Sequence, residues 1–525
     1  MLENFPFYLG LLILILLLIM LANKIKVAYP ILLVLAGLVI SFIPGVPIIN
    51  IQPELIFFIF LPPLLYEAAW TVSWKEMWKW RRIITSFAFV VVFLSALSVA
   101  LVANYLIPGF SLALGFVLGG IVSPPDAVSA GAILKFVKVP KGISSILEGE
   151  SLLNDASSLI IFRFAMIAVA TEQFLFYKAA SSFGWMIIGG VAIGLLIGWL
   201  FMKAHRYLPT DANMDIVLTL LTPYIIYLAA EEAHSSGVLA VVSGGLLLSN
   251  NRHRFLNSRS RLHGINVWES FCFILNGLVF MLIGLDLPQI TKGLEEVNIS
   301  ISSAIGYGIV ITLVLMVSRM LSSYGALVIT FIVRKFITVA DRAPGIKTPF
   351  ILGWTGMRGV VSLAAALSIP VYLNNGNGFP QRNLILFITF VVILLTLLIQ
   401  GLTLPYFIKK IDFKTTDDKL TKDEIYHNIQ QELAQYAIHY LKTNYNGEIE
   451  NNPSLQHLIQ KWEQHTNINE DESIGNDLKP IYLDLLHKQR EWLINKNRQD
   501  QTLDESIIRR QMHYLDIEEE KLRYI

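Results

Sequence analysis

The chain has 525 residues, of which 54% are hydrophobic and only 15% are charged. Soluble domains carry about 25% charged residues, so this composition excludes an ordinary soluble fold and indicates a membrane protein. The net charge of +1 gives no basis for a nucleic-acid partner, and the one cysteine, Cys272, excludes an internal disulfide and a cysteine-rich metal site.

Apolar segments follow one another along the first 410 residues, and we predict that each spans the membrane. The thirteen predicted spans are approximately 5–23, 28–43, 54–71, 83–106, 110–134, 145–171, 184–203, 214–232, 236–249, 267–286, 301–333, 350–371 and 384–408. The first follows Met-Leu-Glu-Asn with neither a basic region nor a cleavage site, so we expect a retained helix and not a removed signal peptide. Span 236–249 is short and rich in Gly and Ser, which predicts a broken or tightly packed helix.

Basic residues gather in every second connection between these spans. If the N-terminus lies outside, the inner connections hold clusters of lysine and arginine, and the outer ones hold only Lys178, Lys292 and Arg382. This alternation follows the positive-inside rule. It predicts thirteen spans with the N-terminus outside and the C-terminus inside.

The composition changes abruptly after residue 411, where polar residues predominate and no further spanning segment occurs. We therefore predict a transmembrane domain over residues 1–410 and a soluble helical cytoplasmic tail over 411–525. Stretches 425–433 and 481–486 have helical spacing. We expect the tail to pack on itself or on a second subunit, with a regulatory module as the alternative. It has no glycine-rich nucleotide fingerprint, so no cofactor is predicted.

The run Ser123-Pro124-Pro125-Asp126 lies inside the fifth predicted span. Each proline removes an N–H donor and clashes with the preceding turn, so the run cannot be continuous helix. Non-helical backbone at membrane depth is tolerated only inside protein or along a wet cavity, and freed carbonyls beside a carboxylate suit a dehydrated monovalent cation. The competing interpretation is a simple proline kink in which Asp126 caps a helix.

A second intramembrane carboxylate, Asp155, follows Glu150, Ser151 and Asn154 in the sixth predicted span. At about 100° per residue, Ser151 and Asp155 share one helix face, and Glu150 and Asn154 share the neighbouring one. A carboxylate at mid-bilayer costs roughly 2.5–3.5 kcal/mol on insertion scales, so such residues usually mark an ion or proton pathway. We predict that Asp126, Asp155, Asn154 and Ser151 bind the transported cation and proton.

Arg358 lies in the twelfth predicted span, among glycines that permit local unwinding, at about the depth of Asp155. A permanent cation there needs an anion, and we predict a supporting ion pair between Glu150 and Arg358 that leaves both aspartates for transport. The alternative pairs Arg358 with an aspartate and leaves Glu150 as the titrating group. Two further buried arginines, Arg163 and Arg319, are expected to be charge-balancing or interfacial.

Several stretches resemble the monovalent cation:proton antiporter family, in the branch of sodium/proton exchangers found in bacteria and animals. The matching stretches, in chain order, are Leu61-Pro62-Pro63, Ser123-Pro124-Pro125-Asp126-Ala127-Val128, Glu150-Ser151-Leu152-Leu153-Asn154-Asp155, Leu275-Asn276-Gly277-Leu278-Val279-Phe280 with Gly284, and Gly356-Met357-Arg358-Gly359. They cover nearly the whole membrane region and none of the tail. Many relatives have Asp-Pro-Val where this chain has Asp126-Ala127-Val128, so the cation preference cannot be transferred from them.

The resemblance implies an all-α fold of two inverted six-helix repeats with discontinuous crossed helices, joined by a linking helix at 184–203. It implies that Asp155 is the shared cation and proton site, that Asp126 is its partner on the unwound helix, and that Glu150 and Arg358 form the supporting pair. It further implies a homodimer in a bacterial inner membrane, with a core bundle that moves against a dimer scaffold. Asn154 in place of a second aspartate is linked by the resemblance to electroneutral exchange.

The predicted function is exchange of Na⁺, with Li⁺ as a further candidate, for H⁺. A buried carboxylate is stabilised by a bound proton or a bound cation, so the two compete for one site. If only loaded forms cross between inward and outward states, exchange is enforced. K⁺/H⁺ exchange is the alternative. An intramembrane protease is disfavoured because neither a Gly-Asp signature nor a His-Glu-x-x-His helix occurs, and a channel because no carbonyl filter occurs.

Overall fold

The computed structural model describes residues 5–44, 53–137, 139–171, 176–295, 299–334, 345–373, 377–411, 422–463, 479–500 and 503–522. Within these ranges every regular element is a helix, apart from an isolated bridge between Tyr372 and Gly378, so the predicted all-α class is confirmed. The chain divides into two compact units. Unit 1 comprises Met1–Ala204, Leu218–Asn251 and Trp268–Phe413, and unit 2 comprises His205–Val217, Arg252–Val267 and Lys414–Ile525.

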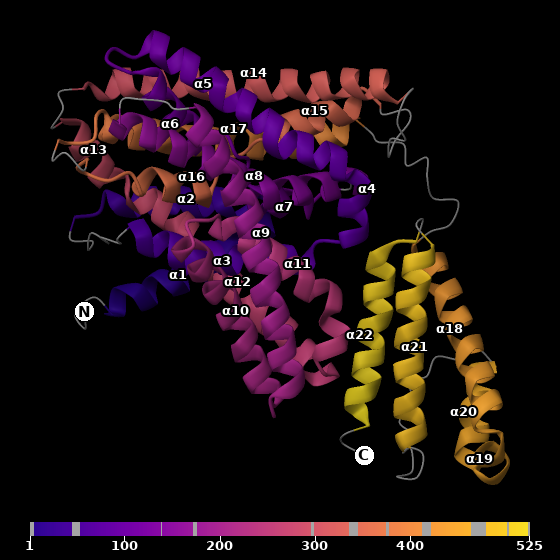
Figure 1. Cartoon of the computed structure of the whole chain (residues 1–525). Coiled ribbons are helices and arrows are strands. Elements are labelled where there is room, and N and C mark those ends of the chain that lie inside the picture. Colours follow the sequence, from indigo (N-terminus) through magenta and orange to yellow (C-terminus); the bar gives the residue numbers. More distant parts are fainter. Residues whose placement is uncertain are drawn as a thin grey trace. The chain divides into compact units, whose positions relative to one another are not determined.

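Figure 1 follows the helices in chain order, from indigo α1 to yellow α22. The first helices are α1 (Phe5–Ile25), α2 (Tyr29–Ser41), α3 (Pro53–Thr71), α4 (Trp74–Thr85), the π-helix η2 (Ser86–Val91), α5 (Val92–Leu106), α6 (Leu112–Val122), α7 (Ala127–Leu134) and α8 (Lys141–Thr171). There follow α9 (Phe176–Tyr207), α10 (Ala212–Glu232), α11 (Gly237–Phe255), α12 (Ser258–Leu285), α13 (Leu287–Glu295), α14 (Ile301–Val333), α15 (Lys347–Trp354), α16 (Val360–Leu367) and α17 (Arg382–Ile411). The tail forms α18 (Lys422–Asn444), α19 (Asn446–Asn451), α20 (Pro453–Glu463), α21 (Lys479–Gln499) and α22 (Glu505–Lys521).

Each predicted span overlaps one or more of these helices; span 83–106 covers the end of α4, η2 and α5. Eight described helices are long and apolar enough to cross a membrane, and α2 and α6 are shorter apolar helices. The chain is therefore a multi-pass membrane protein, whereas the count of thirteen crossings stays a prediction. The span predicted at 236–249 is the continuous helix α11, and its tight packing is real: a Cβ added at Gly194 of α9 would lie 2.7 Å from the carbonyl carbon of Ala240.

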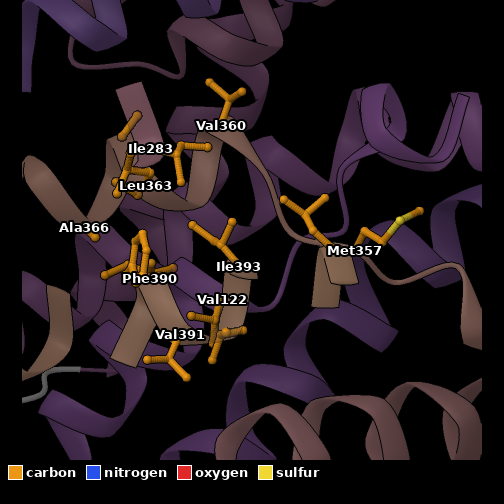
Figure 2. Close-up of a cluster of buried hydrophobic side chains, with 14 of the residues drawn as sticks. Val122, Ile283, Met357, Val360, Leu363, Ala366, Phe390, Val391 and Ile393 are labelled. Carbon is orange, nitrogen blue, oxygen red and sulfur yellow. The ribbon is translucent and has the colours of Figure 1, made fainter. Parts of the chain in front are cut away.

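Two predicted spans are broken in the middle. The fifth divides into α6 and α7, and the twelfth divides into α15 and α16. We call the intervening residues 123–126 the first break and 355–359 the second break. Both lie within the apolar core of unit 1, which includes Val122 before the first break, Met357 inside the second, and Phe390 and Ile393 of α17 (Figure 2).

Unit 2 has its own apolar core, formed by tail helices α18, α20, α21 and α22, so the expectation that the tail packs on itself is confirmed. Figure 1 shows α21 and α22 side by side. Buried polar contacts occur among the tail helices, within the short segments that unit 2 takes from the rest of the chain, and between the two. The carboxylate of Asp516 accepts hydrogen bonds from Arg490, at 3.0 Å, and from Nε of Arg261, at 2.9 Å. Nδ1 of His205 lies 2.9 Å from the carboxylate of Asp215.

Candidate functional site

The first break begins where the α6 helix meets its two prolines. α6 ends at Val122 and α7 begins at Ala127, with Asp126 at the N-cap of α7. The Asp126 carboxylate accepts hydrogen bonds from the backbone N–H groups of Val128, at 3.1 Å, and Ser129, at 3.2 Å, and from the Ser129 hydroxyl. Asp126 is therefore a helix cap, as the competing interpretation proposed, and its negative charge lies at the positive end of the α7 dipole.

The two breaks are hydrogen-bonded to each other. The backbone N–H of Asp126 donates to the carbonyl of Met357 over 2.7 Å, which gives these two freed backbone groups a partner away from water. Gly359 lies against the same aspartate, because a Cβ added there would lie 2.8 Å from the Cβ of Asp126. Only glycine permits this approach, so the crossing of the two breaks depends on a residue without a side chain.

Asn154 connects α8 to the first break. Its side-chain Nδ2 donates to the carbonyl of Pro125 over 3.1 Å, and the residue is fully buried. Its Oδ1 has no hydrogen-bond partner within the described part of the chain. The amide thus fixes the unwound backbone with one end and presents an acceptor oxygen with the other.

Asp155 follows on the same helix and is 8% exposed. Its carboxylate lies close enough to Asp126 to interact with it electrostatically, and it makes no hydrogen bond or ion pair with any residue that the structure describes. Ser151, one turn earlier on α8, is half-buried. The structure therefore brings together Asp155, Asn154 and the first break. The oxygen atoms of carboxylate, amide and unwound backbone are the ligands with which transporters bind Na⁺.

The predicted pair between Glu150 and Arg358 is wrong. Glu150 accepts a two-pronged hydrogen bond from Arg319 of α14, with Nη1 to Oε1 at 2.7 Å and Nη2 to Oε2 at 2.9 Å. Both side chains are buried, and Nε of Arg319 also donates to the carbonyl of Leu352 at 3.2 Å. Arg319 is thus the charge-balancing partner of Glu150 and joins α8, α14 and α15.

Arg358 instead binds backbone carbonyls. Its Nε donates to Val122 at 2.8 Å, Nη2 donates to Ser123 at 3.4 Å, and Nη1 donates to Gly356. A guanidinium is a favourable neighbour for the negative end of a helix dipole, here the C-terminus of α6. The alternative that paired Arg358 with an aspartate is not seen either. Arg358 thus supplies donors to carbonyls at the point where α6 ends and helical hydrogen bonding stops.

The π-helix η2 adds contacts that the sequence analysis did not anticipate. Its Phe87 ring lies 5.9 Å from the guanidinium of Arg319, and the carbonyl of Ala88 accepts a hydrogen bond from Ser157 of α8. A π-helix shifts backbone hydrogen bonds out of the usual register, which frees such a carbonyl. The run Ser86–Val91 carries no proline or glycine that signals this irregularity.

A family model described as "Sodium/hydrogen exchanger, transmembrane" matches residues 11–410. The chain belongs to the sodium/hydrogen exchanger family. The match covers the membrane helices α1 to α17 almost completely and stops before the tail.

Individual curated proteins and a solved structure are also similar to this chain. The sodium, potassium, lithium and rubidium/H⁺ antiporter of Bacillus subtilis is 36% identical over 386 residues, or 72% of this chain, and the Na⁺/H⁺ antiporter of Aphanothece halophytica is 34% identical over 74% of this chain and 70% of its own length. The match spans only 57% of the B. subtilis protein. The sodium proton antiporter MjNhaP1 of Methanocaldococcus jannaschii has the same fold, with a TM-score of 0.61 over 77% of this chain and 97% of that one, at 18% identity.

We predict that Arg319→Ala lowers stability strongly, because Glu150 is left as a buried charge without its partner. The expected loss is about 3–5 kcal/mol, seen as a large fall in the thermal unfolding midpoint of the purified exchanger. Arg163→Ala is the matched control: its pair with Glu231 is 40% and 29% exposed on the two side chains, so we expect a loss below about 1 kcal/mol. Equal midpoints for the two variants would contradict the assigned role of Arg319.

Proposed function

We propose that this exchanger exchanges Na⁺, with Li⁺ as a second substrate, for H⁺ across a membrane. The observation that carries the proposal is a buried carboxylate, that of Asp155, which has no partner among the residues that the structure describes and lies beside the crossing of two broken helices. A carboxylate in that setting needs a counter-charge, and a proton or a small cation supplies it. Family membership supports the same class of activity.

The four polar side chains of the site have different roles in binding the cation and the proton. Asp155 carries the exchangeable charge, because its carboxylate makes no hydrogen bond or ion pair within the described residues. Asn154 and Ser151 supply neutral oxygens, and Asp126, held as the cap of α7, adds a second negative field. The backbone of Ser123, Pro124 and Pro125 completes the set as the unwound segment beside the carboxylates.

Competition at this site produces exchange. Asp155 binds either a proton or a cation, and an empty, charged carboxylate is costly to carry through the apolar core. Only the two loaded forms therefore change between inward-open and outward-open states, and each crossing in one direction with a cation is paired with a return crossing with a proton. Since Asn154 adds no titrating charge beside Asp155, we propose one-for-one, electroneutral exchange.

The wider setting of this exchange is also proposed. The alternation of basic connections supports an N-terminus outside and a cytoplasmic C-terminus in the cell (inner) membrane. The resemblance of the motifs supports a homodimer. No nucleic acid or cofactor enters the mechanism.

K⁺/H⁺ exchange is the second candidate. It is favoured by the B. subtilis relative, whose printed substrates include potassium and rubidium. A site that accepts both ions would show overlapping responses to the two cations.

We predict that everted membrane vesicles containing this exchanger release protons when Na⁺ or Li⁺ is added, and that Asp155→Asn and Asp126→Asn each abolish the release. Collapse of a preformed pH gradient, followed with a fluorescent amine, measures this. The matched control is Glu148→Gln, which removes an exposed carboxylate two turns from Asp155 on the same helix and leaves exchange intact.

Robust exchange in either aspartate variant would overturn the site assignment. A response to K⁺ alone would favour the second candidate. No response to any of the three cations over a wide pH range would exclude antiport.

We predict that turnover of the purified exchanger in liposomes is independent of membrane voltage, because one positive charge moves in each direction. The voltage is set with K⁺ and valinomycin, in the range of ±100 mV, where one net charge is worth about 2.3 kcal/mol. A clear change of rate with voltage would rule out electroneutral exchange.

A further inference from the structure

Helix α17 carries a line of polar residues on one face although it is the most apolar of the eight candidate spans. At about 100° per residue, four residues fall within an arc of about 60°. They are Thr389, Thr396, Gln400 and Thr403. We call this line the α17 polar face.

Two members of this face hold the second break. The hydroxyl of Thr396 accepts a hydrogen bond from the backbone N–H of Arg358 at 3.1 Å, and that of Thr403 accepts one from the indole of Trp354 at 3.0 Å. Both hydroxyls also donate back into α17, Thr396 to Val392 and Thr403 to Ile399. Each is therefore used as acceptor and donor, and each fastens α17 to the region of the second break.

Gln400 lies between these two contacts, one turn after Thr396 on the same face. It is fully buried, and within the described residues neither its Oε1 nor its Nε2 has a hydrogen-bond partner. An unpaired buried amide is unfavourable, and an apolar residue of the same shape would remove that cost. The presence of a glutamine at position 400 is explained if its side-chain amide is hydrogen-bonded in another conformational state of the protein.

The place of α17 in the chain suggests the partner. α8 is the next long helix after the first break and bonds to it through Asn154, and α17 is the next long helix after the second break and bonds to it through Thr396. The two contacts that flank Gln400 along this face go to Arg358 in the second break and to Trp354 directly before it, where the backbone leaves helical hydrogen bonding. We infer that Gln400 is a positioning residue for exchange, whose side-chain amide pairs with backbone groups of residues 355–359 when the broken helices rearrange. This inference rests on the proposed antiport function.

Gln400→Met tests the inference, because it keeps the shape and removes only the amide. In this state nothing is unpaired by the change, so the thermal unfolding midpoint should stay equal or rise. The maximal rate of Na⁺-driven proton movement in liposomes should fall about fivefold or more, the effect of one lost buried hydrogen bond, while the KM for Na⁺ changes by less than about twofold. Gln400→Asn retains an amide and should recover at least half of the lost rate.

Thr389→Val is the matched control. It removes another buried hydroxyl that has no partner among the described residues, on the same face and about 16 Å from Gln400, and should leave the rate unchanged. An unchanged rate in Gln400→Met would overturn the inference, as would a fall in its unfolding midpoint or an equal slowing in Thr389→Val. Failure of the proposed function itself would be recognised separately, as absence of Na⁺-driven proton movement in the unmodified chain.

Discussion

The hydrogen bond from the backbone N–H of Asp126 to the carbonyl of Met357 joins the two helix breaks at the centre of unit 1. Helix breaks inside an apolar core leave backbone groups that neither water nor lipid can satisfy. Here the two breaks satisfy each other, and Arg358 covers the carbonyls at the end of α6. Gly359 permits the contact because it has no side chain. The crossing is therefore a polar region inside the apolar core, and the Asp155 carboxylate, which we propose exchanges cation and proton, lies beside it.

The charged groups around this crossing are paired, except for one carboxylate. Glu150 is neutralised by Arg319, Asp126 by the N-terminus of α7, and Arg358 by the carbonyl groups of the first break. Asp155 makes no such contact within the described residues. A cation or a proton that binds there meets a site whose other charges are already balanced, which is the condition for competition between the two at one carboxylate.

The local features of this site could be predicted from the sequence, and its long-range pairing could not. Prolines 124 and 125 forbid helix whatever surrounds them, so the first break follows from composition alone. The partner of Glu150 depends on how α8 packs against α14, across 169 residues, and two buried arginines were available to it. Its depth along the predicted span made Arg358 the expected partner of Glu150. In the structure the guanidinium of Arg358 donates instead to carbonyls at the end of α6 and in the first break, which only the crossing of the two breaks brings near. Likewise, the π-helix η2 and the segments that join the tail in unit 2 have no sequence signal of their own.

We propose that cation and proton share the Asp155 carboxylate. The most direct measurement is the KM for Na⁺ of the reconstituted exchanger as the pH is lowered with no gradient across the membrane. Competition at one site predicts that the KM rises as the proton concentration rises, approaching tenfold for each pH unit, while the maximal rate of Na⁺–Na⁺ exchange extrapolated to saturation stays constant. A KM that does not change with pH, with a maximal rate that falls instead, would contradict a shared site.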